Sequence, residues 1–137
     1  MNRFRKVDAT LTAEFAKPYD YGHPERSDCF MMGCALVDAL EGRNLVQKYA
    51  GAYKTLAGAQ RALRKRGFKS LIDFWTVELG RPPVAAAEAQ FGDLVILRLA
   101  DGAEHVGACV GTRFSTKTPN GRRDYGLSDV VAAFHIG

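Results

Sequence analysis

The sequence predicts a single α+β domain over residues 1–137, with N-terminal helices packed on a small antiparallel sheet. Apolar residues recur at three- and four-residue spacing as far as residue 80, which is typical of amphipathic helices. From residue 93 they gather in short segments that are typical of strands. Asp101-Gly102, between two of these segments, is a hairpin signal.

Two helices are expected before residue 42. The first spans residues 8–17, because Pro18 disfavours helical conformation in the residue before it. The second begins at Ser27 or Asp28, either of which can cap its free N–H groups, and it ends at the stop signal Gly42. Most of the circumference of this second helix is apolar, so we expect it to be buried at the centre of the fold.

Two further helices and four strands are expected after residue 50. One helix runs from Thr55 to Gly67 and the next follows the cap Ser70 as far as Gly80. The strands are expected at residues 93–99, 104–112, 114–118 and 130–136, with a turn at residues 119–121. Helices first and strands afterwards place the helices on one side of the sheet.

The composition is that of an ordinary globular protein, with 47% hydrophobic and 25% charged residues. No apolar run reaches membrane-spanning length, so membrane insertion is not expected. The net charge of +4 comes largely from residues 61–66. Such a cluster is either the solvated face of a helix or a binding surface for nucleic acid. We expect the solvated face and no nucleic-acid partner, because no nucleic-acid-binding motif is present.

The three cysteines, Cys29, Cys34 and Cys109, are expected to be reduced thiols in a protein made in a cytoplasm. Their number is odd and no two of them have C-x-x-C spacing. The first residues do not form a secretory signal peptide. Metal ligation by the three cysteines and three histidines is possible, but no ligand spacing supports it.

Cys29 stands where a helix is expected to begin. The free N–H groups of a first helical turn carry partial positive charge, which favours a thiolate over a thiol. A cysteine nucleophile also needs a base, and His105 at the start of a predicted strand is the candidate. An isolated cysteine and an isolated histidine are also compatible with purely structural roles, and their spacing alone does not decide between the two interpretations.

Four segments of the chain resemble, in kind and order, the motifs of the NlpC/P60 cysteine peptidases. They are residues 18–22 (PYDYG), 28–29 (DC), 92–95 (GDLV) and 105–111 (HVGACVG). The resemblance covers residues 10–136. It is closest to the small NlpC/P60-like proteins encoded among tail genes of phages and prophages.

This resemblance implies a papain-like fold and hydrolysis of peptide bonds in bacterial peptidoglycan, without a metal or organic cofactor. Cys29 would be the nucleophile, and His105 the base that then protonates the leaving amine. Tyr19 matches a tyrosine beside the nucleophile that helps to bind the oxyanion. The third catalytic position of the family falls near Ser115 and Lys117, and neither is the expected residue type. Lysine has no acceptor for an imidazole N–H.

The resemblance leaves two classes of function open. One is a tail-associated hydrolase that acts on peptidoglycan peptides. The other is a tail-tip or tail-assembly protein that docks to other tail proteins with little or no hydrolysis, because a fold alone does not determine function. Either protein would be made in the bacterial cytoplasm, and either is compatible with incorporation into a virion tail.

Overall fold

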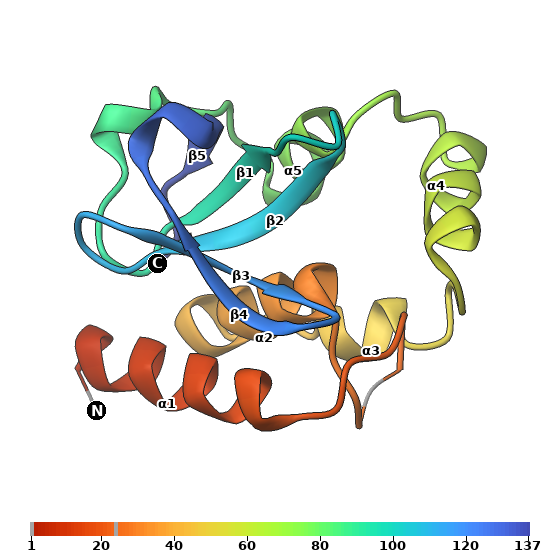
Figure 1. Cartoon of the computed structure of the whole chain (residues 1–137), viewed down its shortest axis with the longest axis horizontal. Helices are drawn as coiled ribbons and strands as arrows, with labels where there is room; N and C mark the ends of the chain where they lie inside the picture. The colour runs from red at the N-terminus through yellow and green to blue at the C-terminus, as the bar shows by residue number, and fades with distance from the viewer. Residues whose placement is uncertain (1, 24) are drawn as a thin grey trace.

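The computed structural model describes residues 2–23 and 25–137 and has the expected α+β organisation, with helices followed by an antiparallel sheet (Figure 1). The helices are α1 (Arg3–Ala16), α2 (Cys29–Glu41), α3 (Leu45–Tyr49), α4 (Leu56–Lys65) and α5 (Leu71–Leu79). The strands are β1 (Leu94–Arg98), β2 (Glu104–Cys109), β3 (Phe114–Thr118), β4 (Gly121–Tyr125) and β5 (Val130–Phe134), with short 3₁₀ turns η1 (Ala86–Glu88) and η2 (Leu127–Asp129).

The five strands lie in the order β4-β3-β2-β1-β5, and each neighbouring pair is antiparallel. β3 pairs with β2 only at Ala108 and Cys109. Beyond these residues the β3–β4 ribbon crosses in front of α2 (Figure 1). The first part of β2, which carries His105, is therefore not covered by strand pairing on that side.

The core fills both faces of the sheet. On one face, α2 and α5 pack against β1, β2 and β5. The opposite face has its own apolar cluster, which includes Val95 and Leu97 and is flanked by η1. α1 packs on α2 through Val7 and Leu11. Within the described residues, no helix is long and apolar enough to cross a membrane.

Helix α2 comes unusually close to β2 at Gly33. A Cβ atom on this glycine would lie 2.6 Å from Val106 Cγ1 and 3.2 Å from Leu94 Cδ1. Because glycine has no Cβ, the helix backbone can rest directly on the two strands. Gly33 lies about one turn after Cys29, so this contact sets the distance between the first residue of α2 and the start of β2.

The helix caps agree with those predicted from the sequence. Asp28, and not Ser27, caps α2, and Gly42 ends it in the left-handed conformation. Thr55 caps α4 and Ser70 caps α5, as predicted.

Three features differ from the prediction. α1 begins at Arg3 and not at residue 8, because the Asn2 side chain accepts a hydrogen bond from the Arg5 N–H at 2.9 Å. α3 and β4 have no counterpart in the prediction. β4 has no apolar alternation and is almost entirely exposed, so only its pairing with β3 makes it a strand.

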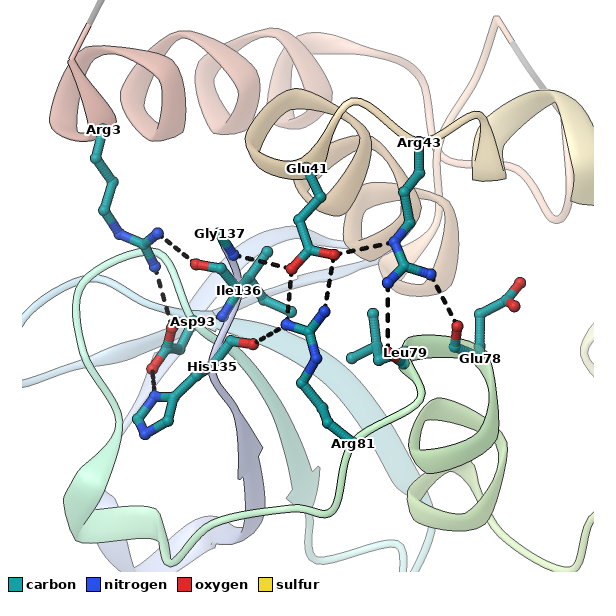
Figure 2. A network of polar contacts seen from close by, with 10 residues as sticks. All are labelled: Arg3, Glu41, Arg43, Glu78, Leu79, Arg81, Asp93, His135, Ile136 and Gly137. Atoms are coloured by element: carbon teal, nitrogen blue, oxygen red, sulfur yellow. Dashed lines mark hydrogen bonds and ion pairs between the residues drawn. The ribbon is translucent and has the colours of Figure 1, made fainter.

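The two ends of the chain are held against the body of the domain by a network of polar contacts (Figure 2). Asp93, which precedes β1, accepts hydrogen bonds from the Arg3 guanidinium at 3.0 Å and the Ile136 N–H at 3.1 Å, and His135 Nδ1 lies 2.7 Å from it. The second carboxylate of the network, Glu41 at the end of α2, accepts hydrogen bonds from Arg43, Arg81 and the Gly137 N–H. We call these residues the terminal network.

Candidate active site

Asp28 joins the start of α2 to the loop before this helix and to the segment that follows α3. Its buried carboxylate accepts hydrogen bonds from the N–H groups of Met31 at 2.7 Å and Gly22 at 3.0 Å, and from the Tyr53 hydroxyl at 2.6 Å. Within the loop between α1 and α2, a bridge joins Tyr19 to Ser27, which lies just before the helix start. These contacts bring Tyr19 to the neighbourhood of Cys29, the first residue of α2.

A cleft of about 610 Å³ opens at this point, and Cys29, His105 and Tyr19 all line it. The three residues come from α2, β2 and the loop before α2. Aromatic and aliphatic side chains form much of the remaining wall. They include Phe30, Tyr49, Tyr53, Leu56, Leu63 and Phe74. The predicted nucleophile, base and oxyanion donor therefore share one cavity.

The surroundings of Cys29, which is partly buried in the wall of the cleft, favour its neutral thiol. Burial, and then the negative charge of Asp28, raise the pKa of the thiol to about 12, although the Val106 N–H favours the thiolate. The N–H groups of Cys29 and Phe30 at the helix start do favour the thiolate, as expected, but their effect on the pKa is the smaller one. The loss of solvation on burial outweighs the partial positive charge of the helix end.

His105 lies opposite Leu97 in the pairing of β2 with β1, and about 26% of its side chain is exposed. Its Nε2 atom lies 3.2 Å from Asp101 Oδ2 and 3.5 Å from Asp101 Oδ1. In the described part of the chain, no hydrogen bond joins His105 to Cys29. The contact with Asp101 uses Nε2, which leaves Nδ1 available to another partner.

Tyr19 lines the same cleft and keeps its proton. Burial, together with the proximity of Cys29, raises the pKa of the Tyr19 hydroxyl far above its ordinary value. The hydroxyl is therefore a hydrogen-bond donor at any physiological pH. The Tyr19 ring also meets Tyr21 edge to face, with 5.3 Å between the ring centroids.

Ser115 and Lys117, the candidates for a third catalytic residue, are engaged elsewhere. The Ser115 hydroxyl donates a hydrogen bond to Asp124 at 2.6 Å. The Lys117 ammonium donates hydrogen bonds to the carbonyls of Glu14 and Lys17, at the end of α1. Lys117 borders the cleft, but neither side chain contacts His105. Neither of these two candidates for the third position therefore orients the imidazole in this structure.

The other two histidines lie outside the cleft. His23 is exposed, and its Nδ1 accepts a hydrogen bond from the Glu25 N–H at 3.0 Å. His135 belongs to the terminal network through Asp93, a partner that the sequence does not indicate. Among the residues that the structure describes, no group of three or more His, Cys, Asp or Glu side chains is placed to hold a metal ion.

Asp101 is the residue of this site that sequence reasoning misses. The sequence indicates only a hairpin turn at Asp101-Gly102, and the turn is present. A further signal is that His105 follows Asp101 by only four residues. A tight hairpin reverses the chain direction, so residues on its two sides lie close together in space.

Together, these features define a class of protein: an α+β domain in which a cysteine at a helix start and a strand histidine share an apolar cleft. The chain belongs to the family described as "Domain of unknown function (DUF6950)", whose model matches residues 2–136. No curated protein matches the chain.

Proposed function

We propose that this protein is a papain-like cysteine hydrolase of the NlpC/P60 type, which cleaves peptide bonds of peptidoglycan and acts with a phage or prophage tail. The observation that carries the proposal is the shared cleft of Cys29, His105 and Tyr19. The substrate class and the tail association are inferred from the motif resemblance. The chemistry below is inferred from the three side chains.

In the proposed reaction, His105 accepts the Cys29 thiol proton as the sulfur attacks the carbonyl carbon of the scissile peptide bond. The carbonyl oxygen becomes an oxyanion, which receives hydrogen bonds from the Tyr19 hydroxyl and the Cys29 backbone N–H. The C–N bond then breaks, and the His105 imidazolium donates its proton to the leaving amine. Water, deprotonated by His105, hydrolyses the thioester, which releases the carboxylic acid and restores the thiol.

The test is digestion of purified muropeptides, with products identified by mass spectrometry. The wild type should release shortened peptides, whereas Cys29→Ala and His105→Ala should each reduce the rate by at least about 10³-fold. The matched control is Cys109→Ala, since Cys109 is a buried thiol that does not line the cleft. Equal products from the wild type and the two site variants would exclude hydrolysis by this site.

The second candidate is a tail-tip or tail-assembly protein that uses the same fold with little or no hydrolysis. It is favoured by the raised pKa of Cys29 and by the absence, in the described chain, of a hydrogen bond between Cys29 and His105. This candidate predicts co-purification with other tail proteins that neither Cys29→Ala nor His105→Ala weakens. It also predicts little or no release of products from muropeptides.

A further inference from the structure

We propose that Asp101, in the turn between β1 and β2, is the positioning residue of the site, which orients the His105 imidazole so that Nδ1 can accept the Cys29 proton. The inference rests on the proposed function and deepens it. It assigns the third position of the site to the hairpin turn, whereas the motif resemblance places that position on the strand after His105.

The first support is that the turn fixes the carboxylate independently of the histidine. Asp101 Oδ1 accepts a hydrogen bond from the Ala103 N–H at 2.9 Å. The Gly102 N–H donates to the Leu99 carbonyl at 2.9 Å, and the positive φ of Gly102, 76°, is one that glycine adopts readily. The other carboxylate oxygen, Asp101 Oδ2, is not the one that accepts this hydrogen bond within the turn, and it lies 3.2 Å from His105 Nε2.

The second support is that the other polar side chains of this region have different partners. Ser115 and Lys117 bond to Asp124 and to the end of α1, as described above. Glu104, next to the histidine in sequence, accepts a hydrogen bond from the Leu71 N–H at 2.9 Å and lies near Arg98. Of the carboxylates in the described chain, Asp101 is the one in contact with the His105 ring.

The third support is chemical. A neutral thiol must lose its proton during attack, so the base needs its acceptor nitrogen free and its developing positive charge stabilised. A carboxylate that accepts a hydrogen bond from Nε2–H does both, because it holds the proton on Nε2 and faces the imidazolium that forms. The Ala103 N–H and His105 hold the pKa of Asp101 below its ordinary value, so the carboxylate is ionised at neutral pH.

The test compares Asp101→Asn with Asp8→Asn, in full-length protein. In Asp101→Asn the side-chain amide oxygen can still accept from the Ala103 N–H, so this change removes the charge and spares the turn. Asp8 is an exposed carboxylate on α1, and its replacement makes the same change in net charge. We expect Asp101→Asn to lower kcat on muropeptides by about 10- to 100-fold, with KM changed less than about twofold. Asp8→Asn should leave both constants unchanged.

The second readout does not depend on hydrolysis. Long-range ¹H–¹⁵N spectra report which ring nitrogen of His105 carries the proton. We expect the proton on Nε2 in the wild type and in Asp8→Asn, and an increased share on Nδ1 in Asp101→Asn. If Asp101→Asn leaves kcat and the tautomer as in the wild type, the proposal is overturned. If no variant hydrolyses muropeptides but the tautomer still depends on Asp101, the positioning role stands and the proposed hydrolase function fails.

Discussion

Cys29 is subject to two opposing effects at the start of α2. The free N–H groups of the first turn favour a thiolate, whereas burial and the neighbouring Asp28 favour the thiol. The second effect is larger, so the surroundings of Cys29 favour the neutral thiol. If the protein is a hydrolase, His105 must act as a true general base during attack.

This protonation state predicts slow alkylation of Cys29. With a pKa of about 12, the thiolate fraction at pH 8 is about 10⁻⁴. Iodoacetamide should therefore modify Cys29 on the order of 10³-fold more slowly at pH 8 than it modifies an ordinary exposed cysteine. The rate should rise about tenfold per pH unit towards pH 12, provided that the protein stays folded. The measurement is the extent of alkylation of the Cys29 peptide over time, by mass spectrometry.

The unfolded chain in urea serves as the control for this experiment, since Cys29 there should react at the ordinary rate. Cys34 and Cys109 give separate peptides and are quantified in parallel. A reaction that is already complete at neutral pH, at the speed of a thiolate, would show that Cys29 is ionised in the folded protein.

At the scale of single residues, the sequence identifies which residues line the cleft but does not predict their pKa values or their polar contacts. Cys29, His105 and Tyr19 can be found because the motif order fixes residue type and position. Their shared cleft depends on the packing of α2 and β2. The hairpin signal at Asp101-Gly102 indicates that Asp101 lies near His105. The contact of Asp101 Oδ2 with His105 Nε2 and the raised pKa of Cys29 depend on side-chain distances and burial, which no local pattern encodes.

Among the secondary-structure elements, the contact between α2 and β2 matters most for the site. The helix and the strand can approach so closely because residue 33 is glycine. A side chain at this position would clash with Val106 and Leu94. Because β-branched valine has few rotamers, Val106 cannot easily move aside.

Gly33→Ala should therefore lower the free energy of unfolding by about 1 to 3 kcal/mol, despite the better helix propensity of alanine. It should also impair any hydrolysis, since α2 carries Cys29 and must shift away from His105. Urea denaturation measures the first effect and muropeptide digestion the second.

A double-mutant cycle with Val106→Ala provides the control. In the Val106→Ala background the methyl group added by Gly33→Ala has room, so the change at Gly33 should cost less than in the wild type. Additive costs would mean that the clash with Val106 is not the cause.

Elements with strong local signals can be predicted, and those without them cannot. The caps Thr55 and Ser70 and the stop at Gly42 locate helix ends because the backbone there needs those residue types. β4 has no such signal, since it exists only by pairing with β3. α3 has five residues, too few for periodicity to reveal it. Its first N–H groups, those of Leu45 and Val46, donate to the Asp38 carboxylate of α2, a partner that no local pattern indicates.

At the scale of the whole molecule, the terminal network ties the two ends of the chain to the domain body (Figure 2). The pKa of one acid of this network, Glu41, is strongly shifted. Burial would raise the pKa of Glu41, but hydrogen bonds from Arg81, Gly137 and Arg43, together with the charge of Arg81, lower it from an ordinary value near 4.5 to about 2.

A pKa that is lower in the folded state stabilises the fold above the pKa of the unfolded chain. The contribution of Glu41 is therefore fully present above about pH 5 and lost as the pH falls from about 4.5 to about 2. Its size is roughly 2 kcal/mol, once the screening of these charges by nearby solvent is allowed for. Glu41→Gln should lower the free energy of unfolding at pH 7, and the difference from the wild type should shrink towards pH 2. Urea denaturation at a series of pH values measures both.

Glu88→Gln is the matched control, because Glu88 is exposed and its replacement makes the same change in charge. It should leave the pH dependence of stability as in the wild type. A difference between Glu41→Gln and the wild type that stays constant from pH 7 to pH 2 would contradict the assignment to Glu41.

The single tryptophan gives the protein an internal optical reporter. Trp75 is completely buried, its ring centroid lies 5.6 Å from that of Phe30, and its indole N–H has no hydrogen-bond partner in the described chain. An indole in such apolar surroundings emits at short wavelength and shifts to longer wavelength when water reaches it. Since Phe30 also lines the cleft, intrinsic fluorescence can follow both unfolding and events at the cleft wall without any added label.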